Sequence, residues 1–180
     1  MDLIFPTWEH DQAVLDYRQE WLECDPGQGI NGSWGLQRKE YEDYGIWLKD
    51  IENLTKGISK NPHINVPATT FLALCDNRMV GNIQMRHYLN DYLLRTYGHV
   101  GYGVRPSERR KGYATQMLFL VIEKYRHSGV DEILLSCDKE NIASRSTIIK
   151  NGGVLENEFA EESGNIVQRY WIKTGAGDYK

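Results

Sequence analysis

The chain has 180 residues, 41% of them hydrophobic and 26% charged, which is the composition of an ordinary globular domain with its own core. Its formal net charge of -4 gives no general affinity for nucleic acid, and no apolar run approaches the roughly 18 residues of a membrane span. The three cysteines form no Cys-x-x-Cys pair, the histidines show no metal-ligand spacing, and the N-terminus has no basic flank. We therefore expect a cytoplasmic protein without a metal or a secretory signal.

The first third of the chain predicts a short strand and two helices. Residues 2–5 form the strand, and apolar positions recur at helical spacing over residues 8–24. A glycine-rich loop follows at residues 26–35. The helical period then returns over residues 36–54, and two prolines break the chain at residues 62–67.

The remainder of the chain alternates between strand and helix patterns. Two apolar runs around a turn at residues 76–78 predict a hairpin, and a later crossover of typical length joins two parallel strands. The sequence therefore predicts one α/β (or α+β) domain, with a mixed, mostly antiparallel sheet of six or seven strands and helices on both faces. The expected strands span 70–75, 79–88, 99–104, 133–137, 154–159 and 166–173, and the expected helices run from Gly112 to Gly129 and from Asn141 to Lys150.

Three adjacent cations, Arg109, Arg110 and Lys111, come just before the N-terminus of the amphipathic helix. The helix dipole already places positive charge there, so each cation costs about 0.3–1 kcal/mol unless a negative group compensates it. The free amides of a first helical turn bind anions, and Gly112 and Ala114 leave room for one to approach. This pattern predicts a bound phosphate or pyrophosphate.

Other interpretations of this segment and of a second glycine pattern have to be weighed. The cations could form a solvated basic loop. The segment lacks the glycine and the Ser/Thr of a P-loop. Gly27-x-Gly29-x-x-Gly32 matches the dinucleotide-binding fingerprint, but it follows a helix and a proline where the fingerprint requires a strand. We interpret it as a loop.

The segment from Arg109 to Ala114 resembles the Arg/Gln-x-x-Gly-x-Gly/Ala pyrophosphate loop of the GNAT acyltransferases. Val104-x-Pro106 is similar to the end of that family's fourth strand, and Asn141-x-x-Ser144 is similar to its next helix. The likeness covers residues 70–173, and the order of elements agrees with the family. Residues 86–103 resemble a bacterial subgroup of predicted acetyltransferases.

The resemblance implies acetyl-CoA as cosubstrate and a GNAT-like domain spanning residues 1–180. Residues 1–67 would form the acceptor side, and residues 68–175 would form the cofactor core, in which two parallel strands splay apart. Family members usually carry a bulge in the first of these strands, where Gly101 and Gly103 lie. A homodimer is expected by analogy. The residues implied in cofactor binding are Val104, Arg109, Arg110, Lys111, Gly112, Tyr113, Ala114, Thr115, Asn141 and Ser144.

Acyl transfer needs a neutral amine, and an amine with a pKa near 10.4 is neutral in only about one molecule in a thousand at neutral pH. We expect His99 to act as the base, directly or through a water, unless it only packs at the start of its strand. Many family members have a tyrosine acid where this chain has Ile148. Ser144, one turn earlier, is the expected substitute, and Tyr102 is a further candidate donor.

These observations predict an N-acetyltransferase that transfers an acetyl group from acetyl-CoA to a primary amine by direct attack. Because the usual tyrosine is missing, a non-catalytic acyl-CoA-binding module is the first alternative. A phosphate-ligand or nucleotide-binding protein is the second. The partner is expected to be a small-molecule or peptide amine, with no nucleic acid and no membrane.

Overall fold

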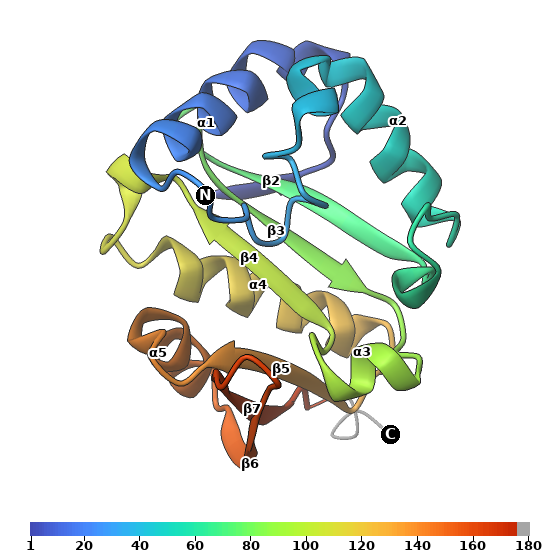
Figure 1. The fold of residues 1–180 in the computed structure, drawn as a ribbon, viewed down its shortest axis with the longest axis vertical. Coiled ribbons are helices and arrows are strands. Elements are labelled where there is room, and N and C mark those ends of the chain that lie inside the picture. The colour runs from blue at the N-terminus through green and yellow to red at the C-terminus, as the bar shows by residue number, and fades with distance from the viewer. Residues whose placement is uncertain (176–180) are drawn as a thin grey trace.

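The computed structural model describes residues 1–175 and contains two antiparallel sheets (Figure 1). The first sheet has the strand order β1-β2-β3-β4, and the second has the order β5-β7-β6. Hydrogen bonding thus divides seven strands, within the predicted six or seven, between two sheets. The strands are β1 (Asp2–Ile4), β2 (Ala68–Cys75), β3 (Arg78–Arg86), β4 (Val100–Val104), β5 (Glu132–Asp138), β6 (Val154–Ala160) and β7 (Ile166–Lys173).

Helices cover both faces of the first sheet. In Figure 1, α1 and α2 lie on one side of it and α4 on the other, next to the second sheet. Short 3-10 turns at 8–10, 39–42, 62–64 and 106–108 connect these elements. The helices are α1 (Asp11–Cys24), α2 (Tyr44–Thr55), α3 (Asp91–Arg95), α4 (Tyr113–His127) and α5 (Ile142–Lys150).

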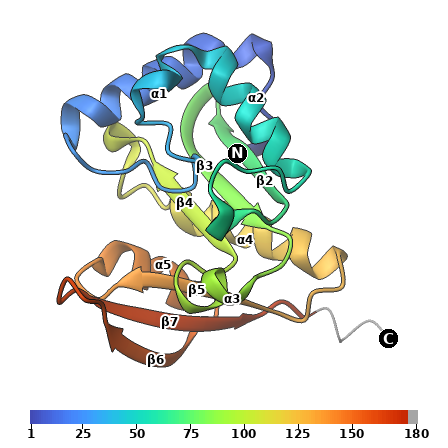
Figure 2. The same cartoon turned by 45° about the vertical axis from the view of Figure 1, so that its right-hand side comes forward.

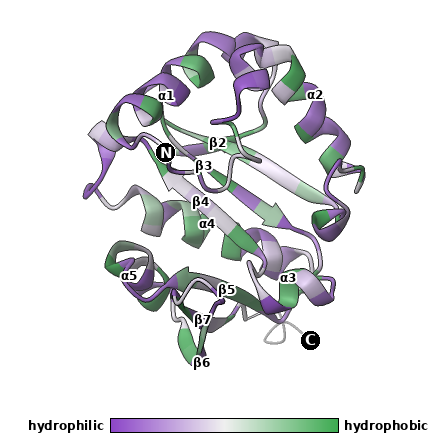
Figure 3. Cartoon of the chain, viewed as in Figure 1, coloured by the Kyte–Doolittle hydropathy of each residue, from purple (hydrophilic) through white to green (hydrophobic). Residues whose placement is uncertain are grey.

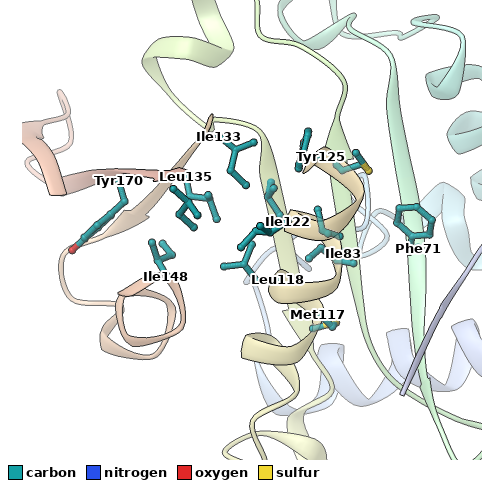
Figure 4. Packing of buried hydrophobic residues seen from close by; sticks show 14 of the residues in the cluster. Phe71, Ile83, Met117, Leu118, Ile122, Tyr125, Ile133, Leu135, Ile148 and Tyr170 are labelled. Atoms are coloured by element: carbon teal, nitrogen blue, oxygen red, sulfur yellow. The ribbon is translucent and has the colours of Figure 1, made fainter. Parts of the chain in front are cut away.

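The larger core surrounds α4, which packs against both sheets. Figure 4 shows Leu118 and Ile122 of α4 beside residues of the second sheet, while Ile83 and Phe71 come from the first. Burying each such side chain contributes about 1.5–3 kcal/mol. The buried stripe on α4 has helical spacing and consists of Met117, Leu118, Val121, Ile122 and Tyr125. Therefore α4, whose first turn carries the predicted anion site, is rigidly held.

A second core lies between the N-terminal helices and the first sheet. Tyr17 of α1, Trp47 of α2 and Leu72 of β2 are completely buried there. Figure 3 shows that the outward faces of these two helices are mostly hydrophilic, as expected for helices that cover a sheet on one side only. The acceptor side predicted for residues 1–67 is thus packed on the same sheet that carries the predicted cofactor strand.

Two elements differ from the sequence expectations. The second helix begins at Tyr44 rather than at residue 36, because Asp43 caps it by accepting a hydrogen bond from the Gly45 amide at 2.9 Å. Leu36 and Tyr41 extended the apparent helical period because they are buried although they lie outside the helix. The unpredicted helix α3 starts where the Asn90 side chain accepts a hydrogen bond from the Leu93 amide at 2.9 Å.

The expected splay of the central strands is present between β4 and β5. The strands meet near one end, where the His99 amide donates to the Leu134 carbonyl at 2.7 Å and an isolated antiparallel bridge links Gly98 to Leu135. Figures 1 and 2 show the two strands separating from that end. The backbones of β4 and β5 therefore form a V, whose open part is called the gap below, and one edge of β4 borders it.

Candidate functional site

The N-terminus of α4 leaves a row of backbone amides free. Gly112 is the N-cap residue in the left-handed conformation (φ 86°), and the first helical hydrogen bond is from the Gln116 amide to its carbonyl. Among the described residues, no group accepts a hydrogen bond from the amides of Arg110 through Thr115. These amides and the helix dipole together form an anion site.

The three cations of the loop have different partners. Arg109 forms an ion pair with Asp25, and its guanidinium lies 4.6 Å from the centre of the Trp21 ring. Lys111 donates to Glu108 at 2.7 Å. The expectation that all three charges lack an internal partner is therefore wrong, because carboxylates compensate two of them. Within residues 1–175, Arg110 forms no ion pair, and it lies exposed in the left-handed region (φ 66°).

The turn before these cations is anchored by α1. Glu20 accepts a hydrogen bond from the Arg105 guanidinium at 2.6 Å and one from the Ser107 amide at 2.7 Å. Burial alone would raise the pKa of the Glu20 carboxyl, but these hydrogen bonds outweigh burial and hold the pKa below its ordinary value. Glu20 is therefore charged at neutral pH. Nothing in the sequence pattern marks it, because its hydrogen-bond partners lie more than 80 residues away.

A groove of about 530 Å³ runs from the start of α4 to the end of α5. The aromatic ring of Phe119 is exposed beside it, and two lysines carry positive charge on its rim. The amide of Asn151 ties the two helices together by donating to the Thr115 carbonyl at 3.2 Å. The groove is lined by Lys111, Gly112, Thr115, Gln116, Phe119, Lys150 and Asn151. It can therefore accommodate an extended anionic ligand that begins at the free amides.

The edge of β4 that borders the V-shaped gap carries free backbone groups. On the other edge, the His99 carbonyl accepts from the Arg86 amide and the Arg105 amide donates to the Val80 carbonyl, both at 2.8 Å. Successive residues of a strand point their backbone groups to alternate edges. The amides and carbonyls of Val100, Tyr102 and Val104 therefore face the gap, as a ligand that pairs like an added strand requires.

The β4 strand itself is regular. Its register with β3 continues without a shift from Val100 to Val104, so the bulge that the family resemblance implied is absent. The glycines of this strand have a different role, which is close packing. A side chain on Gly101 or on Gly103 would approach backbone atoms of the loop at residues 31–32.

His99 lies at the apex of the gap and holds its two strands together. Its Nδ1 atom accepts a hydrogen bond from the Leu134 amide at 2.9 Å, and its ring packs edge-on against Tyr125. Because burial removes the imidazole from water, the pKa of His99 is lowered to about 4. The ring is therefore neutral, with its proton on Nε2. This geometry does not favour the predicted role as base, because the acceptor nitrogen is already occupied.

Two of the predicted catalytic residues come together across the gap. The Tyr102 hydroxyl lies 2.8 Å from the Ser144 hydroxyl, and Asn141 caps α5 by accepting from the Ser144 amide at 3.0 Å. Burial raises the pKa of Tyr102, so its hydroxyl stays protonated at neutral pH. Ile148 is completely buried in the core, as its side chain requires. The Tyr102–Ser144 pair can donate a proton into the gap.

The predicted cofactor residues Val104 to Thr115 run from the end of β4 into the first turn of α4. The Tyr113 ring packs partly against the core there, while Ala114 and Thr115 are half-buried. In the described part of the chain, no group of three or more His, Cys, Asp or Glu side chains could hold a metal ion. None of the described helices is long and apolar enough to cross a membrane.

Comparisons with known proteins give a match to one family and to solved structures of one fold. The family model of the acetyltransferase (GNAT) domain matches residues 5–154. No curated protein matches the sequence. Among solved structures, RimL, a ribosomal L7/L12 alpha-N-protein acetyltransferase in complex with coenzyme A, is similar with a TM-score of 0.71 and 18% identity over 97% of this chain and 94% of that chain.

Two further structures have the same fold. The microcin C7 self-immunity acetyltransferase MccE, in complex with acetyl-CoA and AMP, has a TM-score of 0.67 and 15% identity over 95% of this chain and 91% of its own. A spermidine N-acetyltransferase SpeG mutant from Vibrio cholerae has a TM-score of 0.65 and 11% identity over 97% of this chain and 96% of its own. At these identities, the likeness shows the fold alone.

Proposed function

Because the chain belongs to the GNAT acetyltransferase family, an acetyl-CoA-dependent group of acyltransferases, we propose that it transfers the acetyl group to a primary amine by direct attack. One observation carries this proposal. The free amides that begin α4 lie next to a strand whose open edge also presents free backbone groups. A ligand with a diphosphate and an amide-containing arm would satisfy both surfaces at once. Acetyl-CoA has both features.

The residues of this chain would hold the cosubstrate through backbone contacts. The amides from Arg110 to Thr115 receive the pyrophosphate, and Arg110 is the cation free to approach it. Val104 pairs with the amides of the pantetheine arm. The rim lysines of the groove, Lys111 and Lys150, lie where they can attract further phosphate charge.

The acetyl group would then lie in the gap between β4 and β5. The amides of Val100 and Tyr102 face that gap, so either can donate to the oxygen that becomes negative during attack. Tyr102, through its hydroxyl paired with Ser144, supplies a proton to the departing thiolate. In this proposal His99 fixes the spacing of the gap. The ammonium form of the amine loses one proton to solvent before attack. The nitrogen loses a second proton as the C–N bond forms and the C–S bond breaks, and this proton replaces the one that Tyr102 gave to the thiolate.

A thermal-shift titration tests the cofactor part of this proposal. Acetyl-CoA is expected to raise the melting temperature in proportion to the logarithm of its concentration, while ATP and NAD should leave it unchanged. An equal shift with ATP would support the nucleotide-binding alternative instead. Equal melting temperatures with and without acetyl-CoA, at concentrations up to the millimolar range, would refute the assignment.

Release of free thiol from acetyl-CoA tests the enzymatic part. A suitable panel contains spermidine, a peptide with a free N-terminal alanine or serine, and a lysine-containing peptide. Spermidine and the N-terminal alanine and serine follow the names of the structural neighbours, and the lysine peptide adds a further kind of primary amine. Turnover with one of them supports the enzyme. Tight acetyl-CoA binding with background turnover throughout would favour a non-catalytic acyl-CoA-binding module, an alternative suggested by Ile148.

The proposal retains the predicted single domain, cytoplasmic location and homodimer. Light scattering measures the oligomeric state directly. The division into two sides needs refinement, because α1 supplies Glu20 and Asp25 to the segment that would hold the cofactor. In this proposal, residues 1–67 form the acceptor side and also anchor the cofactor loop.

A further inference from the structure

The glycine-rich loop between α1 and α2 lies directly on β4. Figures 1 and 2 both show this loop crossing in front of the strand. The contact is close, because a Cβ atom on Gly32 (φ 72°) would lie 2.3 Å from the Gly101 carbonyl oxygen, and one on Gly103 would lie 2.9 Å from the Asn31 carbonyl oxygen. Only glycines allow the two backbones to approach to this distance.

A buried chain of hydrogen bonds holds the loop in this place. The Tyr17 hydroxyl of α1 donates to Asn82 Oδ1 at 2.6 Å, and Asn82 Nδ2 donates to the Asn31 carbonyl at 2.9 Å. Asn82 is only 1% exposed and lies in the middle of β3. One side chain therefore ties together a helix, a central strand and the loop.

The two hydrogen bonds that the side chain of residue 82 makes require a carboxamide group there. The Asn31 carbonyl can only accept a hydrogen bond, so the residue that meets it must donate. Its other side-chain atom accepts from Tyr17. An aspartate could satisfy Tyr17, but its ionised carboxylate would face the Asn31 carbonyl without a proton. A buried polar side chain in an apolar strand is costly unless it is paired, and here both of its ends are paired.

Because of where the loop lies, these hydrogen bonds can affect the proposed reaction. The loop covers the face of β4 opposite α4, beside the residues whose backbone groups face the gap. An amine that approaches the gap from this face passes residues 31–33. A displacement of the loop by even 1 Å would change the angle and distance of attack.

We infer that Asn82 is a positioning residue for the amine acceptor: it fixes the glycine-rich loop against β4 and so sets the position of the loop that an amine approaching this face of β4 would meet. The inference rests on the proposed function, because it assumes that the acetyl group lies in the gap. It assigns no contact between Asn82 and either substrate. A substitution of Asn82 should therefore change the KM for the amine and leave the affinity for acetyl-CoA unchanged.

The experiment compares Asn82→Asp with Tyr17→Phe. Both variants perturb the same buried chain, but Tyr17→Phe leaves the bond from Asn82 to the loop in place. With whichever panel amine the wild type acetylates fastest, Asn82→Asp should raise the KM for the amine about tenfold, while Tyr17→Phe should change it less than twofold. Acetyl-CoA affinity should stay within twofold of wild type in both.

Hydrogen exchange of the loop provides a measurement that does not depend on activity. Amides of residues 28–36 should exchange faster in Asn82→Asp and at the wild-type rate in Tyr17→Phe. Gly32→Ala gives a second test, because it displaces the same loop without changing the side chain of Tyr17 or Asn82. It should raise the KM for the amine as well, even if Asn82→Asp fails to fold.

The two proposals fail in different ways. If the wild type neither binds acetyl-CoA nor acetylates a panel amine, the proposed function is wrong. If the wild type is active and Gly32→Ala has an unchanged KM for the amine, the positioning role is wrong. Equal KM changes in Asn82→Asp and Tyr17→Phe would also overturn it, because they would reflect only lost stability.

Discussion

The proposed cofactor side and the proposed acceptor side of this protein would use different physical means to position a ligand. On the cofactor side, the start of α4 and the open edge of β4 present backbone amides and carbonyls. On the acceptor side, the glycine-rich loop has no ladder of its own and depends on buried side chains such as Asn82. Backbone groups tolerate many sequences, whereas a side-chain anchor is sensitive to one substitution. Substitutions on the two sides should therefore differ in what they change.

The largest effect is expected from Gly112→Ala on the cofactor side. A Cβ at this left-handed residue meets no protein atom, so any clash would be with the ligand. We expect acetyl-CoA affinity to fall about a hundredfold, which corresponds to about 2.7 kcal/mol. Isothermal titration calorimetry measures the acetyl-CoA affinity of the variant and of the wild type.

Gly129→Ala is the matched control for this variant. Gly129 is also left-handed and open, but it follows the other end of α4. Both substitutions should lower the free energy of unfolding by about 1–2 kcal/mol through backbone strain. If Gly129→Ala weakens acetyl-CoA binding as much as Gly112→Ala does, strain in α4 explains the loss and the contact with phosphate does not.

The next largest effect is expected on the pH dependence of stability, through His99, which lies where β4 and β5 meet. The folded-state pKa of His99 is lowered to about 4, below its ordinary value near 6.5, so the unfolded state binds more protons between these values. The free energy of unfolding should therefore fall as the pH drops through this window, by about 2 kcal/mol between pH 7.5 and pH 5. Urea denaturation at both values measures this fall.

His99→Asn is the informative variant here, because its side-chain oxygen can still accept from the Leu134 amide. It should abolish most of the pH dependence and keep substantial activity. A large loss of kcat in His99→Asn, together with loss of a titration in the pH–rate profile, would restore His99 as the catalytic base.

A tenfold effect is expected from Arg109→Glu. The variant places a carboxylate opposite Asp25 and next to the anion site, so acetyl-CoA affinity should fall at least tenfold. The double variant Asp25→Arg/Arg109→Glu restores the ion pair with reversed charges. If affinity returns with it, Arg109 acts by tying α1 to the loop. If affinity stays low, Arg109 acts on the phosphate directly.

The start of α4 could be predicted from the sequence because its signals are local. Residues 109–114 form one continuous motif, and the helix behind it has a clear apolar period, so the order of elements and the free amides could be inferred without a structure. The contacts that escaped are long-range: Arg109 meets Asp25 across 84 positions, His99 meets Leu134 across 35, and Asn82 meets Asn31 across 51. For Asn82, its polar side chain within an apolar strand was a sign that it makes a buried hydrogen bond, but the sequence did not indicate which residue it contacts.

The smallest effect is expected from Tyr102→Phe, which tests whether the gap between the two sheets contains a proton donor. The change removes the hydroxyl that lies 2.8 Å from Ser144 and leaves the ring that packs against the core. We expect kcat to fall about threefold to tenfold with an acetyl-CoA affinity close to wild type, because solvent can still protonate the departing thiolate when the pair is broken. Ser144→Ala should have a similar effect, and the double variant should lose little more than either, since the two hydroxyls act as one unit. Steady-state kinetics on the three variants measures these changes in kcat. Additive losses would mean that the hydroxyls act independently, and unchanged kcat in all three would mean that the thiolate leaves without help from this pair.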